Sequence, residues 1–156
     1  MPKPLALALS IAGCELVGVV GSVFTAPAIP TWYASLNKPV FTPPNWVFAP
    51  VWITLYFLMG ASLFLIWQGG PPTQKRKETV LLFLVQLFFT TLWSFLFFGF
   101  RWPAVALVVV AVLLGMIVIT VVKFWSFSRI ASVLLWPYLA WVCFASVLNA
   151  AVVVLN

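Results

Sequence analysis

The residues in this sequence with the clearest capacity for chemistry are tryptophans placed inside apolar segments. Trp52, Trp93 and Trp141 each lie well within such a segment rather than at its ends. An indole ring in that position offers a flat face for stacking, and its N–H needs a hydrogen-bond partner or a polar cavity. Two interpretations follow: the rings either pack the core, or they line a site for a flat aromatic ligand.

Other residue types narrow the chemistry. The chain contains no histidine, which excludes histidine metal sites, Ser-His triads and a histidine-ligated haem. Cys14 and Cys143 lie in apolar segments, where a free cysteine behaves as a small hydrophobic residue. Glu15 lies near the middle of the first apolar segment, where a charge is costly, so we expect it to face the interior or to be protonated. It marks either a proton or ligand contact, or a neutral, hydrogen-bonded carboxyl near a mouth.

The composition predicts the elements that position these residues. Of 156 residues, 65% are hydrophobic and only 6% are charged, against about 25% charged in a soluble domain. A membrane-spanning helix needs about 20 predominantly apolar residues. The sequence therefore predicts an all-α integral membrane protein, a single domain over residues 1–156 with five transmembrane helices. These helices are expected over about 5–24, 44–67, 78–98, 103–122 and 130–155, with a kink at Pro137 in the last.

A long loop is predicted between the first two helices. Residues 25–43 are rich in proline and also carry Trp32, Tyr33 and Phe41. Loops of this length in compact domains are usually functional lids or disordered linkers. Because disordered segments are poor in aromatic residues, we expect an ordered lid over one mouth of the bundle.

The basic residues predict the orientation of the chain. The formal charge is +6, and in a five-helix arrangement six cations lie on the amino-terminal side and two, Lys38 and Arg101, on the other. The positive-inside rule then predicts a cytoplasmic amino terminus, although the host membrane stays open. The run 75–77 (Lys-Arg-Lys) is expected to be a solvated anchor for anionic lipid headgroups. In this setting the positive charge indicates a lipid bilayer as partner and no nucleic acid.

Polar and aromatic residues at helical spacing predict which faces point inward. The three stripes are Trp52, Tyr56, Met59 and Leu63; Gln86, Thr90, Trp93 and Phe97; and Tyr138, Trp141, Ala145 and Asn149. The helix over 103–122 contains mostly Val, Leu, Ala and Gly, and is expected to face mainly lipid, with Ala111 and Gly115 as a candidate dimer contact. Tryptophans near the helix ends are expected to be interface anchors: Trp46, Trp67, Trp102 and Trp125.

Several long motifs resemble one known family. Residues 32–44 read WYASLNKPVFTPP, and residues 50–56 read PVWITLY. Further matches are QL at 86–87, Trp93, FFG at 97–99, PYLAW at 137–141 and the segment from Ala145 to Asn149. Together these motifs, which cover nearly the whole chain, resemble the TspO/MBR translocator protein family, also called the peripheral benzodiazepine receptor.

The resemblance implies a function and a set of site residues. Members are five-helix bundles, commonly homodimers, whose pocket is capped by the first loop and takes porphyrins, and in some members cholesterol or synthetic aromatic ligands. The positions implied to contact ligand are Trp32, Tyr33, Lys38, Trp52, Tyr56, Gln86, Thr90, Trp93, Tyr138, Trp141, Ala145 and Asn149. Trp52 and Trp141 match tryptophans implicated in light-dependent porphyrin breakdown, so they are also the catalytic candidates.

Two departures from the family pattern affect the expected ligands. Many members carry Asn where Thr90 stands, so a polar contact to the ligand is expected to be made differently here. Residues 150–154 read AAVVV, where animal members carry a sterol-recognition pattern. Sterol binding through that motif is therefore not expected.

Three functions stay open at this point. The leading hypothesis is a membrane receptor or carrier for porphyrin-type tetrapyrroles, or for another flat, lipophilic aromatic ligand. The second is tryptophan-dependent, photo-oxidative porphyrin degradation, and the third is a membrane scaffold or regulator without an obligatory ligand. The sequence contains no cluster of metal-binding residues, and a tetrapyrrole is expected as ligand rather than as a required cofactor.

Overall fold

A computed structural model describes residues 2–71 and 73–156, and every element in these residues is helical. In chain order the elements are α1 (Lys3–Ala28), η1 (Ile29–Tyr33), η2 (Asn45–Val47), α2 (Phe48–Gln68), α3 (Gln74–Ser94), η3 (Phe95–Gly99), α4 (Pro103–Phe127), α5 (Arg129–Leu134) and α6 (Trp136–Leu155). The short elements η1 and η3 are π-helical turns that extend α1 and α3, and η2 is a 3₁₀ turn that leads into α2.

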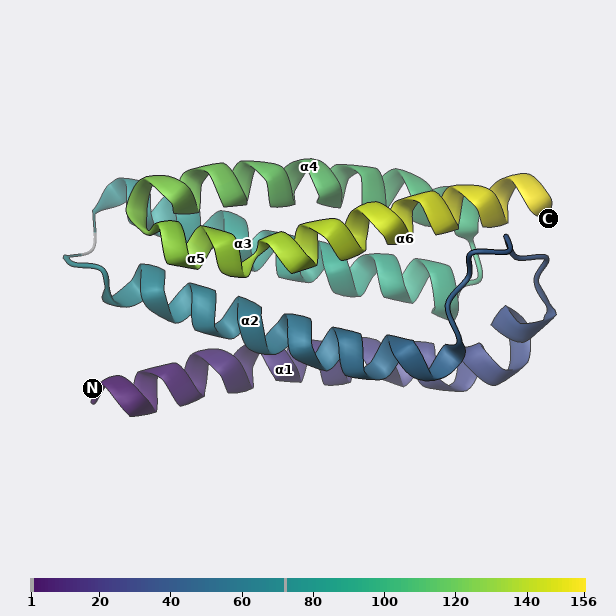
Figure 1. The fold of residues 1–156 in the computed structure, drawn as a ribbon, viewed down its shortest axis with the longest axis horizontal. Helices are drawn as coiled ribbons and strands as arrows, with labels where there is room; N and C mark the ends of the chain where they lie inside the picture. Colours follow the sequence, from purple (N-terminus) through teal and green to yellow (C-terminus); the bar gives the residue numbers. More distant parts are fainter. Residues whose placement is uncertain (1, 72) are drawn as a thin grey trace.

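The elements form five spans that run along a common axis (Figure 1). Each span is 24 to 31 residues long, with a mean hydropathy of 1.9 to 3.2 over its most apolar window. Hydrocarbon offers no partners for backbone N–H and C=O groups, so an apolar segment of this length is stable there as a helix. The prediction of an all-α bundle with five membrane-spanning helices is confirmed.

The two ends of the bundle differ in charge. The amino terminus, the turn between α2 and α3 and the turn between α4 and α5 lie at one end, and the loop after η1 lies with the carboxyl terminus at the other (Figure 1). The first end therefore collects the cations at positions 3, 75–77, 123 and 129, as the sequence predicted. The cytoplasmic orientation of that end stays a prediction.

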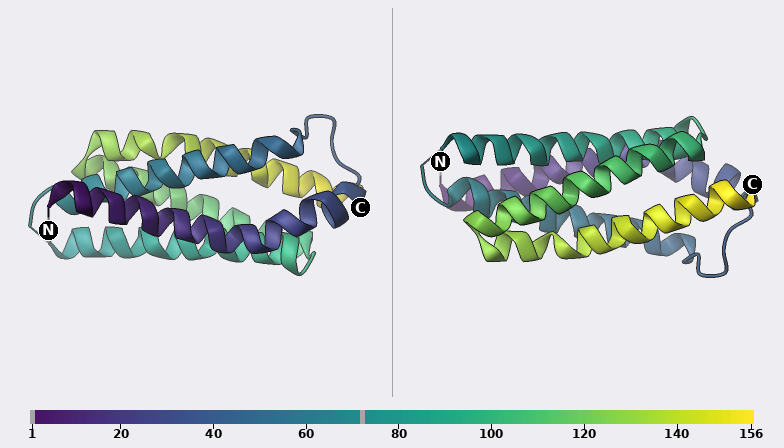
Figure 2. Two further views of the ribbon diagram at one scale, coloured as in Figure 1. Left: turned by 90° about the horizontal axis from the view of Figure 1, so that it is seen from below. Right: turned by 90° about the horizontal axis from the view of Figure 1, so that it is seen from above.

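Helices α1 and α2 approach most closely near the amino-terminal end. A Cβ atom added at Gly60 would lie 2.5 Å from the Ile11 Cα and 2.9 Å from the Ser10 carbonyl oxygen, so the two backbones touch at this point. A Cβ atom added at Gly18 would lie 2.6 Å from the Tyr56 ring. Beyond Gly18 the two helices diverge toward the loop end (Figure 2, left). Small residues thus determine how closely the two helices approach at their crossing point, as is common between membrane helices.

The first helix is longer, and the first loop shorter, than the sequence predicted. Helical backbone continues to residue 35, so the segment 25–35 assigned to a lid loop is wrong, and non-helical backbone is confined to residues 36–44. Proline usually ends or kinks a helix because it lacks an N–H, and Pro27 and Pro30 both lie in this segment. Instead the chain widens into the π-helical turn η1, and the Thr31 hydroxyl donates to the Pro27 carbonyl at 2.7 Å. Side chains and wider turns of this kind allow proline within membrane helices.

The basic run after α2 is not a wholly solvated anchor. Helix α3 begins at Gln74 rather than at 78, and the Thr73 hydroxyl accepts from the Arg76 N–H at its start. The Arg76 side chain is buried, and its guanidinium donates to the carbonyls of Gly69 at 3.0 Å, Gly70, and Pro71 at 2.6 Å. This part of the prediction is wrong because the open carbonyls after the end of α2 need a donor.

Helix α4 extends to Phe127 and exposes most of its surface, as predicted, but it also buries one continuous face. It packs against α3 on one side and against α5 and α6 on the other. Its fully buried residues recur at helical spacing: Ala106, Val110, Leu113, Ile117, Thr120 and Phe124. The remaining faces are exposed, including Gly115, around which an added Cβ would meet nothing within 4 Å. Ala111 and Gly115 are thus both exposed on the described structure, and a homodimer stays a prediction.

The last span contains the predicted break. The helix is interrupted at Leu135, between α5 and α6, two residues before Pro137. The Ser132 hydroxyl donates to the Val121 carbonyl at 2.8 Å, and Ser62 donates to the Ala131 carbonyl at 2.6 Å, so α5 is fixed to both α4 and α2. The chain changes direction at this break, so that α5 and α6 are not collinear (Figure 1).

The contact at Gly60 yields a stability prediction. Gly60→Ala is expected to lower the free energy of unfolding by about 1–3 kcal/mol, because the new methyl group meets backbone atoms that cannot rotate aside. Gly115→Ala is the matched control, since that position is open, and it should cause no loss. Thermal unfolding of the purified protein in one detergent checks both; equal losses in the two variants would contradict the assigned contact.

Candidate functional site

A cavity of about 300 Å³ lies inside the bundle, on the loop side of the crossing between α1 and α2. Its walls come from α1, η1, α2, α3, η3 and α6. The lining residues are Glu15, Gly18, Val19, Gly21, Ser22, Thr25, Ala26, Ile29, Tyr33, Phe48, Ala49, Trp52, Ile53, Tyr56, Thr90, Trp93, Ser94, Phe97, Phe98, Trp141, Phe144, Ala145, Leu148 and Asn149. Its volume is at the lower end of the range for small-molecule sites.

Aromatic rings form a continuous wall on one side of this cavity. The centroid of the Trp52 ring lies 5.6 Å from that of Tyr56 and 6.4 Å from that of Trp93. Trp93 continues the wall to Phe97, at 5.9 Å. The three pairs have interplanar angles of 30° to 37°, so the rings are tilted rather than perpendicular. Such a surface is suited to van der Waals contact and stacking with a flat ligand.

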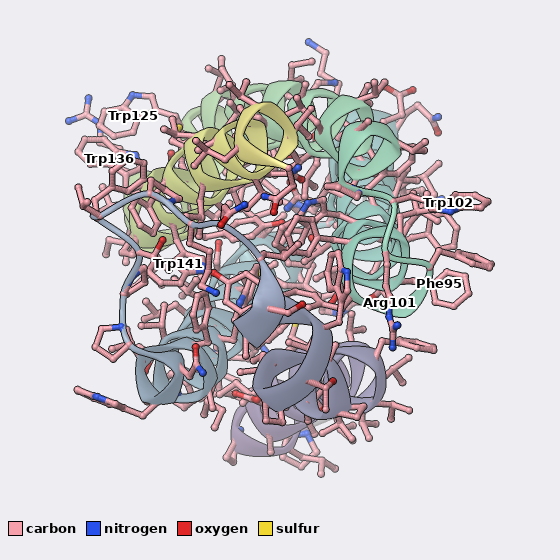
Figure 3. The ribbon with its side chains drawn as sticks, turned by 90° about the vertical axis from the view of Figure 1, so that its right-hand side faces the viewer. Phe95, Arg101, Trp102, Trp125, Trp136 and Trp141 are labelled. Carbon is pink, nitrogen blue, oxygen red and sulfur yellow. The ribbon has the colours of Figure 1, made fainter. Side chains whose placement is uncertain are left out.

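Trp141 of α6 also lines the cavity. Its ring centroid lies 6.0 Å from Phe48 of α2 and 5.5 Å from Phe144 of α6. Seen from the loop end, Trp141 lies within the bundle between α6 and α2, whereas Trp125 and Trp136 stack on each other at the outer surface (Figure 3). Trp136 and Trp141 both belong to α6, and of these two tryptophans only Trp141 lines the cavity.

One asparagine connects three helices at the loop end of the cavity. The Asn149 Oδ1 accepts from the Trp93 Nε1–H at 3.1 Å, and its Nδ2 donates to the Pro103 carbonyl at 2.8 Å. Both side chains are buried. The indole N–H is therefore satisfied by α6 while its ring faces the cavity, and the amide also holds the start of α4. Asn149 fixes the orientation of Trp93.

A second polar contact supports the other end of the aromatic wall. The Thr90 hydroxyl forms a hydrogen bond of 2.7 Å with the Tyr138 hydroxyl and one of 3.0 Å with the Gln86 carbonyl. Tyr138 has no exposed surface and lies outside the lining, behind Thr90. Thr25 and Ser94 form a further contact of 2.8 Å, which joins α1 to α3 along the cavity.

Several known proteins are similar in sequence to this chain over most of its length. A profile of the TspO/MBR family matches residues 10–155. The Tryptophan-rich protein TspO of Archaeoglobus fulgidus is 44% identical over 152 residues, 97% of this chain and 97% of that protein. The Translocator protein of Homo sapiens is 40% identical over 134 residues, 85% and 79% of the two chains, and the Tryptophan-rich sensory protein of Cereibacter sphaeroides is 38% identical over 125 residues, 80% and 77%. The chain belongs to the TspO/MBR family.

In this TspO/MBR protein, eight of the twelve side chains predicted to contact ligand lie in the lining of the cavity. The lining includes Tyr33, Trp52, Tyr56, Thr90, Trp93, Trp141, Ala145 and Asn149. Four predicted residues lie outside it: Trp32, Lys38, Gln86 and Tyr138. Trp32 packs edge-on against Phe97 at 5.5 Å, and Gln86 is fully buried without a partner for its side-chain amide. Ligand contact itself stays a prediction for all twelve.

Lys38, one of the four predicted residues outside the lining, binds the backbone of its own segment. Its ammonium donates to the carbonyls of Tyr33 at 2.7 Å, Leu36 at 3.2 Å and Ala34 at 3.3 Å, and it lies 4.9 Å from the centroid of the Tyr33 ring. These carbonyls lie at the end of the first helical span and lack helical partners. The ammonium thus closes that helix end and lies outside the cavity lining.

Sequence reasoning singled out Glu15 as a possible ligand contact but missed the rest of the face that the first helix contributes. Glu15, Ser22 and Ile29 all line the cavity, and they are spaced by seven residues, which places them on one face of a helix. Gly18, Thr25 and Ala26 extend the same face. Because the surrounding residues are apolar and small, the stripe carries no aromatic signal, but its few polar residues at this spacing could have revealed it.

The Asn149 contacts predict a coupling between two side chains. Asn149→Leu is expected to reduce the free energy of unfolding by about 1–2 kcal/mol, because it leaves the Trp93 N–H unpaired in the bundle interior and removes the bond to the Pro103 carbonyl. In a Trp93→Phe background the same change should cost less, since the N–H that would be left unpaired is already gone. A double-mutant cycle measured by reversible unfolding checks this; strictly additive costs would contradict the hydrogen bond.

Proposed function

We propose that this protein is a membrane receptor or carrier that binds porphyrin-type tetrapyrroles in the cavity between α1, α2, α3 and α6. The observation that carries the proposal is the aromatic wall formed by Trp52, Tyr56, Trp93 and Phe97, together with Trp141 in the same cavity lining. Indole faces held in place by hydrogen bonds give a flat macrocycle stacking partners without a large ordering cost. The names of the relatives, translocator protein and sensory protein, are consistent with a receptor role.

The size of the cavity determines how such a ligand would lie. A macrocycle is larger than the ligands that a cavity of about 300 Å³ encloses. Five lining residues are also exposed at the outer surface: Val19, Ser22, Ala26, Ala49 and Ile53. The cavity therefore reaches the surface where α1 and α2 diverge, and we call this opening the α1–α2 seam. A bound tetrapyrrole would stack on the aromatic wall and extend through the seam.

The first loop supports a lid role at the end of the bundle. The Asn37 N–H donates to the Asn156 Oδ1 at 2.9 Å, and the Asn156 Nδ2 donates back to the Asn37 carbonyl at 3.0 Å. Phe41 packs on Phe144 of the lining, with the ring centroids 6.2 Å apart. Loop and carboxyl terminus thus hold each other beside the cavity, and entry from this end requires these contacts to open.

The proposal predicts saturable porphyrin binding that depends on the cavity tryptophans. Protoporphyrin added in the dark to the protein in lipid nanodiscs should quench tryptophan fluorescence and shift the porphyrin absorbance with a single midpoint. The double variant Trp52→Phe, Trp141→Phe should weaken the affinity about fivefold to tenfold, because two stacking faces become smaller.

The matched control removes two tryptophans outside the cavity. Trp67→Phe, Trp125→Phe loses the same number of indoles from exposed positions and should keep the wild-type affinity. Identical weakening in both double variants would place the porphyrin elsewhere. Absence of saturation, together with no thermal stabilisation by any tetrapyrrole, would favour the ligand-independent scaffold.

A second candidate function is light-dependent breakdown of the bound porphyrin. The close packing of oxidisable rings at Trp52 and Trp93 favours it, since the ligand and dioxygen would supply the photochemistry beside them. Illumination of the complex in air should then convert the porphyrin to a defined product, and Trp52→Phe should abolish the conversion while binding persists. Bleaching at the same rate, and to the same products, as free porphyrin would contradict catalysis.

A further inference from the structure

Glu15 is the one acidic or basic residue among the described residues that line the cavity. It lies on α1, one turn before Gly18, and thus at the end of the cavity where α1 and α2 cross. Its side chain is half-buried. A carboxyl group at this depth in an apolar span is costly unless it has a partner. The position therefore requires an explanation that packing alone does not give.

The described part of the chain supplies no such partner. Glu78, the other acidic residue, accepts a hydrogen bond from Gln74 at 2.9 Å, whereas no side-chain hydrogen bond among the described residues reaches Glu15. Lys38 is bound to backbone carbonyls near the other end of the cavity, and Arg76 is bound to those after α2. The carboxyl thus faces a cavity whose lining contains no cation.

A second polar group in the lining lacks a partner as well. Tyr33 is only 2% exposed, its hydroxyl forms no hydrogen bond, and it belongs to the loop end of the same cavity. Buried hydroxyls are normally hydrogen-bonded, so an unpaired one in a cavity wall points to a ligand. The lining thus contains a carboxyl-bearing residue at one end, a residue with an unpaired buried hydroxyl at the other, and aromatic faces between them.

We propose that Glu15 is a specificity-determining residue, which accepts a charge-assisted hydrogen bond from an ammonium or N–H group on a flat aromatic ligand. The inference rests on the proposed ligand-binding role of the cavity and adds the chemical class that it selects. Among aromatic ligands of equal shape, a cation should bind more tightly than a neutral compound, and a neutral compound more tightly than an anion. A carboxylate would be repelled by Glu15 and find no cation in the lining.

The same argument orients a tetrapyrrole. Its carboxylate side chains cannot be paired at the Glu15 end, so they should point away from it, toward the loop end or out of the α1–α2 seam. The macrocycle would then present its uncharged edge to the inner end of the cavity. Glu15 would thus determine the orientation of the bound ligand as well as the ligand charge that the site prefers.

Three probes with one three-ring skeleton test the inference. They are 9-aminoacridine, a cation at neutral pH; 9-methylanthracene, which is neutral; and anthracene-9-carboxylate, an anion. Binding to the protein in zwitterionic nanodiscs, measured by probe fluorescence and corrected for empty nanodiscs, should favour the cation over the neutral probe by about tenfold or more, because charge-assisted hydrogen bonds are the strong ones. Glu15→Gln should remove that preference and leave the neutral probe unchanged within about twofold.

Glu78→Gln is the matched control, since it makes the same change in net charge outside the cavity, and it should keep the wild-type order. Glu15→Asp, which retains the charge on a shorter side chain, should retain part of the preference. Equal affinity of the wild type for cation and anion would overturn the inference even if Glu15→Gln fails to fold, and so would an unchanged preference in a folded Glu15→Gln.

This outcome is separable from the fate of the proposed function. Porphyrin binding that depends on Trp52 and Trp141, without any charge preference among the three probes, would contradict the role of Glu15 but leave the proposed function standing. A Glu15-dependent cation preference without porphyrin binding would retain the site and replace the tetrapyrrole with a smaller aromatic cation.

Discussion

A backbone in hydrocarbon must satisfy its own N–H and C=O groups, and most features of this protein follow from that requirement. It makes the five apolar segments helical, and it also explains the exceptions to regular helix. Thr31 donates to a carbonyl beside the two prolines of the first span, Lys38 covers the carbonyls at its end, and Arg76 covers those after α2. Side chains that look like surface charges or breakers in sequence therefore complete the backbone hydrogen bonding.

Because lipid tails are as apolar as the helices, close contacts and polar pairs must hold the bundle together. Gly60 allows two backbones to touch, Ser62 and Ser132 fix the short helix α5, and Asn149 links α6 to α3 and α4. These contacts leave α1 and α2 free to diverge on the loop side. The cavity exists because the tight crossing is confined to one end.

The resulting cavity combines an aromatic wall with a single carboxyl group. Its aromatic wall would by itself accept almost any flat, lipophilic compound, while a carboxyl in an apolar span would by itself be a cost. In the proposed site they would act together, so that both the shape and the charge of the ligand are selected. The α1–α2 seam would then give a lipophilic ligand a route from the bilayer that avoids water.

Much of this was determined by the sequence alone. Length and hydropathy fixed five membrane helices, the break near Pro137 was predicted from the missing N–H of proline, and aromatic residues at helical spacing identified the cavity faces of α2, α3 and α6. These signals are local, because each depends on the chemistry of neighbouring residues in one helix. The motifs also pointed to the TspO/MBR family before the fold was known.

Only the tertiary structure decided which apolar face of α4 is buried, because lipid and protein interior favour the same residue types. It also decided that Lys38 and Arg76 serve the backbone, since carbonyls that lack partners are visible only once the helix ends are placed. Glu15 is the plainest case: its position in the chain showed that it needs a partner, but only the divergence of α1 from α2 turned it toward a cavity where a ligand could be that partner.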